Sequence, residues 1–262
     1  MISFDLDFFP HQDARGDEYG SFDYWLDAFS SALYSNGNIF DAWNELELED
    51  RVRVRATGPE EPALLQQNWS RYAKDSFRKA TDFCHRGAIF QVIFEDVEDL
   101  SICACSQPEL YILRTSSSDR GLPVDCGCCG SAVPLYRLSH IKGEEDHYRL
   151  LGWQKTSSAL DRLWMESGVG ERFAYRQLAR PRSDFFNLTR ELAADLEAAS
   201  KVSTYSFLLH YHKKWGKRCP LCSRKWRWED SPDELFAFKC DHCRLVSSEA
   251  SDEKTPLREL HP

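Results

Sequence analysis

Hydrophobic and polar positions follow two different periods in the first hundred residues. Residues 2–9 alternate before a short apolar run and residues 46–56 alternate strictly, which predicts strands with one buried face, the second stretch as a hairpin or two short strands. Residues 22–35 and about 66–86 repeat apolar side chains every three or four positions, which predicts two amphipathic helices. The apolar run 88–94 predicts a buried strand.

The first of these helices has recognisable boundaries. Ser21 is a good N-cap residue, and Asn36-Gly37 can adopt the left-handed backbone that ends a helix. The order strand, helix, strand, strand, helix, strand is that of a ferredoxin-like, split βαβ sandwich. We therefore predict an acidic α+β domain of this kind over residues 1–98.

The rest of the chain predicts shorter α+β pieces. Strands are expected at 106–113, 133–136 and 204–210, and helices at 159–166 and 185–200. We divide this part into a middle zinc-binding region with helices (99–203), a C-terminal zinc ribbon (204–248) and a flexible tail (249–262).

The composition favours a folded cytoplasmic protein. Apolar residues make up 42% of 262 positions, and the first residues lack the basic and long apolar regions of a signal peptide. No stretch approaches the roughly eighteen apolar residues of a membrane-spanning helix. In a reducing compartment the ten cysteines are better explained by metal than by disulfides.

Four cysteines near the C-terminus have the spacing of a zinc ribbon. Cys219 and Cys222 form one Cys-x2-Cys pair, Cys240 and Cys243 form another, and seventeen residues separate them. Four thiolates complete the tetrahedral shell that Zn²⁺ accepts and leave no open position, so we predict a structural ion. Two disulfides in a secreted module are the alternative.

A second cluster lies in the middle region. Cys103 and Cys105 are followed, after twenty residues, by Cys126, Cys128 and Cys129. The Cys126 and Cys129 pair reproduces the Cys-x2-Cys spacing, so we predict a second structural zinc ion held with Cys103 and Cys105. Cys128 would be a spare thiol, although the sequence leaves open whether it replaces a ligand. Free buried cysteines are the alternative.

Two further residues bear on this chemistry. Gly127, inside the second cluster, can adopt the positive φ of a tight turn. Cys84 lies on the apolar face of the second predicted helix without a partner nearby in the sequence, so we expect a buried structural thiol.

Charge is distributed unevenly along the chain. Residues 1–50 hold twelve acidic side chains and one basic side chain, Arg15, whereas the other 212 residues carry 32 basic against 30 acidic side chains. Residues 211–228 contain basic residues and no acid. These basic residues are Lys213, Lys214, Lys217, Arg218, Arg224, Lys225 and Arg227.

Longer motifs carry a family resemblance. They are Cys103-x-Cys105-Ser-Gln-Pro, Cys126-Gly-x-Cys129, Pro134-Leu-Tyr-Arg137, Gly170-Glu-Arg-Phe173 with Arg176-Gln177, Cys219-Pro-x-Cys222 and Phe238-Lys-Cys-Asp-x-Cys-Arg-Leu245. From about Cys103 to Ser247 the chain resembles a bacterial family of zinc-ribbon-containing proteins for which nucleic-acid binding has been suggested. The resemblance implies both zinc sites, a residue other than cysteine at the position of Cys128, and no established activity.

The acidic N-terminal domain fits a basic protein partner, because complementary charge steers association. The most concrete form is an immunity or antitoxin protein that inhibits a cationic nuclease. We predict that Asp13, Asp17, Glu18 and Asp23 bind the partner. Exposed aromatic side chains are expected beside them, namely Tyr19, Phe22, Tyr24 and Trp43. An acidic face that only keeps the protein soluble is the simpler alternative.

Nucleic-acid binding through the ribbon is the alternative function. The basic residues of 211–228 can neutralise phosphates, and Trp215, Trp226 and Trp228 can stack on bases. The same residues also fit an ordinary solvated surface around a tryptophan-packed ribbon core.

We expect no enzymatic activity. Both predicted metal sites are closed, and the sequence has no phosphate-binding glycine loop, nucleophile elbow or His-Glu-x-x-His motif. His210 and His212 form only a weak ligand pair. The polar cluster of Glu171, Arg172, Arg176 and Gln177 fits a structural network as well as chemistry. The sequence names neither the partner nor the oligomeric state.

Overall fold

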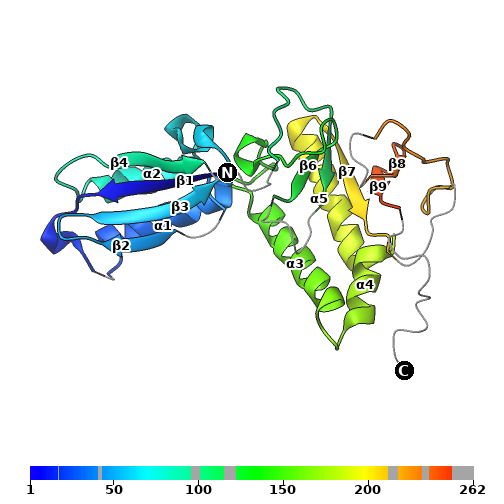
Figure 1. Cartoon of the computed structure of the whole chain (residues 1–262), viewed down its shortest axis with the longest axis horizontal. Coiled ribbons are helices and arrows are strands. Elements are labelled where there is room, and N and C mark those ends of the chain that lie inside the picture. The colour runs from blue at the N-terminus through cyan, green and yellow to red at the C-terminus, as the bar shows by residue number, and fades with distance from the viewer. Residues whose placement is uncertain are drawn as a thin grey trace. The chain divides into compact units, whose positions relative to one another are not determined.

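The computed structural model describes residues 1–16, 18–40, 43–95, 101–114, 122–211, 218–231 and 236–249. The chain forms two compact units (Figure 1). Unit 1 consists of Met1–Ile102 and Pro134–Tyr148, and unit 2 of Cys103–Val133 and Arg149–Pro262. Each unit contains helices and a β-sheet, so the predicted α+β class is confirmed.

Unit 1 is built on a four-stranded antiparallel sheet in the order β2-β3-β1-β4. The strands are β1 (Ile2–Phe8), β2 (Asn44–Glu47), β3 (Val52–Gly58) and β4 (Ile89–Glu95). The helices are α1 (Phe22–Asn36) and α2 (Arg71–Thr81), and short 3-10 turns cover Gln12–Ala14, Glu61–Leu64, Gln66–Asn68 and Leu135–Arg137. Strands and helices follow one another along the chain in the predicted order.

The alternating pattern of β1 separates a hydrophobic face from a charged one. Phe4, Leu6 and Phe8 are fully buried and pack with Phe29 of α1 and with Trp69, which precedes α2. Burying such side chains contributes about 1.5–3 kcal/mol each. The core of unit 1 therefore lies on the face of the sheet that the helices cover.

The intervening residues of β1 lie on the opposite face, paired with arginines of β3. The strand register places Asp5 opposite Arg55 and Asp7 opposite Arg53. Arg53 donates to Asp7 through Nε and Nη2 at 2.7 and 2.8 Å, and Arg55 donates to Asp5 at 2.8 and 2.9 Å. The hydrogen bonds from Arg53 lower the pKa of Asp7. Two of the twelve N-terminal acids are thus neutralised inside the unit.

The helix boundaries follow from their caps. Ser21 Oγ accepts a hydrogen bond from the backbone N–H of Tyr24, and α1 ends at Gly37 with φ +76°, as predicted. Helix α2 is shorter than predicted. The Ser70 hydroxyl caps its first turn by accepting from Ala73 N, and the preceding residues form the 3-10 turn Gln66–Asn68.

A pair of histidines from the segment 134–148 is packed into unit 1. The rings of His140 and His147 lie 4.6 Å apart, and His140 Nε2 is 3.0 Å from Oδ1 of Asn36. His147 is only 1% exposed. Burial, and then the charge of His140, lower the pKa of His147 to about 3.

Acidification is expected to destabilise unit 1 through His147. Unfolded histidine titrates near pH 6.5, so between that pH and about 3 the unfolded state binds more protons and stability falls as pH falls. Through His147 the free energy of unfolding changes by at most about 1.4 kcal/mol per pH unit. Urea unfolding of the wild type and of His147→Gln at pH 7 and pH 5 measures it. Equal pH dependence in both proteins would contradict the assignment.

Unit 2 contains a five-stranded sheet in the order β6-β5-β7-β9-β8. The strands are β5 (Leu110–Leu113), β6 (Val124–Cys126), β7 (Ser203–Leu208), β8 (Phe238–Cys240) and β9 (Leu245–Ser247), and the helices are α3 (Tyr148–Met165), α4 (Glu171–Ala179) and α5 (Asp184–Ser200). The three central strands are parallel, and the edge strands β6 and β8 run antiparallel to their neighbours. None of the helices in the described ranges is long and apolar enough to cross a membrane.

The structure differs from the predicted layout in three respects. The middle region and the ribbon share the sheet of unit 2, while 134–148 belongs to unit 1. The strand predicted at 133–136 is a 3-10 turn that begins after Pro134. Helix α3 starts well before the predicted 159–166, because Gly152 and the serine and threonine positions after it interrupt the apolar pattern without ending the helix.

Candidate metal centres

The structure brings the predicted cysteine ligands into two separate groups of four. The first group is Cys103, Cys105, Cys126 and Cys129, and the second is Cys219, Cys222, Cys240 and Cys243. Within each group the Sγ atoms all lie within 4.8 Å of one another. A tetrahedral shell with metal–sulfur bonds of about 2.3 Å places its sulfurs about 3.8 Å apart. Each group can therefore hold one metal ion after small side-chain adjustments.

The sulfur atoms are not joined by disulfides. All ten cysteines lie in the described ranges, and all are free thiols. Sγ of Cys222 and Sγ of Cys240 are 3.5 Å apart, well beyond the S–S bond length of about 2.05 Å. The geometry is that of a shared ligand shell.

The three Cys-x2-Cys pairs end in the same kind of backbone turn. The residue that follows the second cysteine is left-handed in each case: Gly130 has φ +75°, Ser223 +61° and Arg244 +51°. Gly127 does not have the positive φ predicted for it. It leaves space for the side chain of Leu110 instead, because a Cβ atom there would lie 1.6 Å from Cδ1 of Leu110 unless that side chain moved.

The two groups lie at opposite edges of one sheet. Cys126 is the last residue of the edge strand β6, and Cys240 is the last residue of the edge strand β8. Both strands run against the parallel set β5, β7 and β9, so both cysteines lie at the same end of the sheet. A metal ion at each group would join each edge hairpin to a separate segment of the chain.

One thiol in each group is prepared to ionise near neutral pH. The backbone N–H of Arg224 lowers the pKa of Cys222 to about 7. At Cys129 burial acts to raise the pKa of the thiol. Hydrogen bonds from Ser131 and from the neighbouring thiols lower it by more, so the pKa of Cys129 is also about 7.

Other thiols of the groups hold their protons. Hydrogen bonding with Cys129 and Cys103 raises the pKa of Cys105 to about 11, and burial raises that of Cys240 to about 11. Four thiols at this distance do not ionise together without a cation. Metal binding would release their protons, so affinity should rise with pH.

The remaining cysteines lie outside both groups. Cys128 is exposed, and its Sγ accepts a hydrogen bond from the backbone N–H of Glu109 at 3.2 Å. Cys84 lies just beyond α2, is half-buried rather than buried, and burial raises its pKa.

The acidic residues predicted to bind a partner occupy different environments. Asp13 and Glu18 are exposed, while Asp17 lies outside the described residues. Asp23 accepts hydrogen bonds from Arg15 Nε at 2.7 Å and from the backbone N–H of Gly16 at 2.8 Å. Asp23 therefore has a structural role at the start of α1, and reversing its charge would disturb the fold.

Only half of the aromatic residues predicted to be exposed are so. Tyr19 is 83% and Tyr24 37% exposed, with ring centroids 4.7 Å apart. Phe22 and Trp43 are buried in the core of unit 1, so that prediction is wrong for them. Their apolar rings complete the helix–sheet interface.

The ribbon separates its basic residues from its tryptophans. Arg218, Arg224, Lys225 and Arg227 are exposed, whereas Lys213, Lys214, Trp215 and Lys217 lie outside the described residues. Trp226 is 1% exposed and stacks on Phe238 with centroids 4.8 Å apart. The prediction that Trp226 contacts nucleic acid is wrong, because its ring fills the ribbon core. Trp228 is half-buried and stacks on Phe236.

Two polar residues singled out in the sequence have local structural roles. Gln177 Oε1 accepts a hydrogen bond from the backbone N–H of Phe185, in the first turn of α5. His210 is 3% exposed, and its Nδ1 lies 3.1 Å from the carbonyl oxygen of Ser248. His212 lies outside the described residues.

The ion pair between the ribbon and α5 was not predicted from the sequence. Arg244, the left-handed residue after Cys243, holds Glu197 of α5 through two nitrogens at 3.0 Å each. Tyr205 of β7 donates to Asp241 in the same turn at 2.6 Å. Only the family-like run ending in Cys243-Arg-Leu245 marked this turn as unusual.

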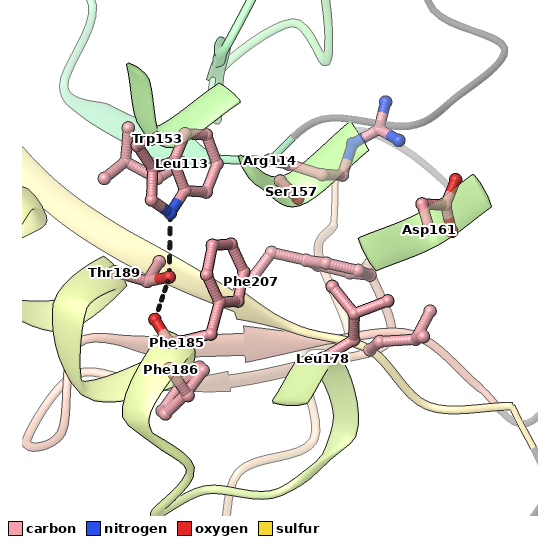
Figure 2. A pocket seen from close by; sticks show the side chains of 11 residues that line it. Leu113, Arg114, Trp153, Ser157, Asp161, Leu178, Phe185, Phe186, Thr189 and Phe207 are labelled. Atoms are coloured by element: carbon pink, nitrogen blue, oxygen red, sulfur yellow. Dashed lines mark hydrogen bonds between the residues drawn. The ribbon is translucent and has the colours of Figure 1, made fainter. Parts of the chain in front are cut away.

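A small cavity lies between α3, α5 and the sheet of unit 2 (Figure 2). Its volume is about 40 Å³, enough for one or two water molecules. Thr189 lies at its wall, accepts a hydrogen bond from Trp153 Nε1 at 2.9 Å and donates to the carbonyl of Phe185 at 2.9 Å. The cavity is too small for a metabolite.

Two family matches cover most of unit 2 and the segment 134–148 of unit 1. Residues 105–209 match a family described as "Domain of unknown function (DUF2310)", and residues 212–253 match one described as "Domain of unknown function (DUF8594)". Neither description mentions a zinc ribbon or an activity. The cysteine groups are therefore identified from their geometry.

The chain is also similar to two proteins of Haemophilus influenzae, each described as an uncharacterized protein. One is 26% identical over 204 residues, covering 74% of this chain and 76% of the relative. The other is 27% identical over 165 residues, covering 61% and 80%. A solved structure, Rv0793 from Mycobacterium tuberculosis, aligns with 37% of this chain and 96% of its own, at 15% identity and a TM-score of 0.31.

Proposed function

We propose that the protein is a zinc-stabilised, non-enzymatic binding protein whose unit 1 binds a basic protein partner. The supporting observation is the division of charge between the units. Unit 1 contains 23 acidic and 11 basic residues, a formal charge of −12, whereas unit 2 contains 19 acidic and 22 basic residues, a formal charge of +3. A charge of this size on one compact unit attracts cationic proteins and repels nucleic acid.

Zinc is the metal that the cysteine groups favour. Four thiolates in a tetrahedral arrangement match its ligand preference, and a shell filled by sulfur leaves no position for a reacting water. The Cys-x2-Cys turns beside the β8–β9 hairpin support the ribbon description, and the order β2-β3-β1-β4 supports the ferredoxin-like description of unit 1. Reduced thiols of this kind fit a cytoplasmic protein.

The partner surface is proposed at the exposed side of α1. Tyr19 and Tyr24 form an exposed aromatic pair, and Asp27 lies one helical turn beyond Tyr24. Partial burial, and then the charge of Asp27, raise the pKa of Glu45 on β2. These acids repel one another in the free protein, and a cationic partner would relieve that repulsion. Aromatic side chains are frequent energetic centres of such interfaces.

Charge reversal tests this proposal. The triple variant Asp13→Lys, Glu18→Lys and Asp27→Lys replaces exposed acids without touching Asp23. In affinity capture from native cells, the wild type should retain a basic protein that the variant loses by at least about tenfold, because like charges would then face each other. The control Glu166→Lys, Glu229→Lys and Asp230→Lys makes the same charge change on exposed positions of unit 2.

Retention that is equal in both triple variants, or that is unchanged at high salt, would contradict the proposal. In the immunity or antitoxin form, the captured protein degrades nucleic acid and the wild-type chain suppresses that activity.

Nucleic-acid binding remains the second candidate, supported by the exposed Arg218, Arg224 and Lys225 on the ribbon. This function predicts that the protein shifts the mobility of DNA or RNA in a gel at low salt, and that the shifted fraction falls steeply as salt is added.

A further inference from the structure

A groove of about 410 Å³ lies in unit 2 beside the ribbon cysteines. It is bordered by α5, by Thr204 and Ser206 of β7 and by the turn that follows Cys240, and its lining includes Arg190, Ala194, Glu197, Ser206, His242 and Arg244. The volume falls in the range of about 300–1,000 Å³ typical of small-molecule sites. It is about ten times that of the cavity beside Thr189.

The acidic residue of the groove is already neutralised. Glu197 accepts hydrogen bonds from Arg244 through both carboxylate oxygens, and one of these also accepts from the backbone N–H of Thr204 at 2.9 Å. Arg190 is exposed at the groove and makes no side-chain hydrogen bond or ion pair with the rest of the described chain. The groove therefore presents one uncompensated guanidinium group.

A buried hydroxyl group without a partner lies in the same groove. Ser206 is 1% exposed, and its Oγ has no hydrogen-bond partner among the residues described. Its backbone N–H is satisfied by the carbonyl of Arg244 at 2.9 Å. Buried polar atoms of this kind are uncommon and reduce stability. This hydroxyl is closed to solvent in the free protein, so a ligand in the groove reaches it when the side chains over it move, and accepting its hydrogen bond would then remove the penalty.

We propose that this groove binds a small molecule that carries an oxyanion, phosphate or carboxylate, on an apolar body. The guanidinium of Arg190 pairs with the oxyanion, because its planar fork matches two such oxygens. Ser206 donates to the ligand, and the imidazole of His242 offers a further polar contact at the rim. The alanine side chains at 193, 194 and 198 leave an apolar wall on α5 for the body of the ligand.

The ribbon thiolates oppose this binding and set its position. Four thiolates around one Zn²⁺ carry a formal charge of −2, and Cys243 borders the groove. Arg244, the next residue, is already paired with Glu197, so that ion pair adds no net charge beside the thiolates. The anionic group is therefore expected at Arg190 on α5 and not at the cysteine turn, because the exposed guanidinium lies in solvent that screens the thiolate charge.

Two-dimensional NMR of the zinc-loaded full chain tests the proposal, with phenyl phosphate and benzoate as probes and phenol as the uncharged control. We expect at least one anion to shift the backbone amides of 204–206 and 242–244 with a Kd of about 1 mM or tighter, and phenol to leave them unchanged. Whichever of the two anions binds with the lower Kd identifies the oxyanion as phosphate or carboxylate. Arg190→Ala should weaken binding about tenfold, whereas Arg182→Ala, a matched exposed arginine, should not.

Ser206→Ala separates ligand binding from folding. Without ligand it should leave the Tm unchanged or raise it, because it removes an unpaired buried hydroxyl, yet it should weaken the anion several-fold. Amides that do not shift with either anion up to about 10 mM, or equal loss of affinity in Arg190→Ala and Arg182→Ala, would overturn the proposal.

Discussion

Replacing Cys219 with serine is expected to release one zinc ion and to unfold the ribbon edge of unit 2. Cys219 is 2% exposed and packs in the same small core as Trp226. Zinc contributes about 10–16 kcal/mol of apparent binding free energy in zinc-finger peptides, which matches or exceeds the 5–15 kcal/mol that holds a typical domain. Since β9 pairs directly with the central strand β7, the loss should reach the sheet itself.

The same result is expected at the other edge for Cys126→Ser. The matched control is Cys128→Ser, in the same turn but outside the ligand group, which should keep both ions. Metal analysis and limited proteolysis of the three variants measure the effect. If Cys219→Ser retained two zinc ions and wild-type protease resistance, the ribbon assignment would be wrong.

Replacing Arg53 with methionine is expected to destabilise unit 1 substantially. Arg53 holds Asp7 through two hydrogen bonds and lies 3.4 Å from Asp5, and the two carboxylates are only 7% and 4% exposed. Leaving the Asp7 carboxylate buried without its main partner costs about 2 kcal/mol, below the 3–5 kcal/mol of a fully broken buried pair because Arg51 still lies 3.5 Å away. Urea unfolding at pH 7 measures this loss.

The pH dependence has a defined sign. The pKa of Asp7 is below its ordinary value of 3.8 in the folded protein, so its contribution is present above pH 3.8 and is lost as the pH falls. The difference between Arg53→Met and wild type should therefore shrink on acidification. The double variant Arg53→Met, Asp7→Asn should recover part of the stability at pH 7. A double variant no more stable than Arg53→Met would refute the buried-pair explanation.

Local chemistry made the first helix and the metal groups predictable. Helix α1 begins after Ser21 and ends at Gly37, as predicted, because helix capping depends on only a few neighbouring residues. The cysteine groups were predictable for a similar reason, since a Cys-x2-Cys turn specifies its own geometry and four thiols have few alternatives to a shared ion. Both are properties of short segments that do not depend on the rest of the fold.

Contacts between distant segments were harder to predict. The count of twelve acids in residues 1–50 overstated the free charge, because Asp5 and Asp7 pair with arginines some fifty residues away. The alternation of Asp5 and Asp7 with apolar residues in β1, and of Arg53 and Arg55 with valines in β3, was a sufficient indication of that pairing. Polar faces of opposite charge on neighbouring strands suggest a buried ion network.

The exposure of aromatic residues was also not predictable from the local sequence. Tyr19 and Phe22 are three residues apart, yet Tyr19 is 83% exposed and Phe22 is fully buried, because the start of α1 turns one of them toward the sheet. Trp226 shows the same effect in the ribbon, where Phe238 of β8 covers its ring. Basic residues around a tryptophan therefore do not by themselves identify a base-stacking surface.

We propose that unit 2 holds two structural zinc ions, one at each edge of its sheet. Native mass spectrometry of the purified, reduced chain tests it most directly, with elemental analysis to identify the metal. We expect two zinc ions per folded chain, each replacing protons from one cysteine group. A folded chain that carries fewer than two zinc ions, or whose mass shows disulfides in place of metal, would contradict the claim.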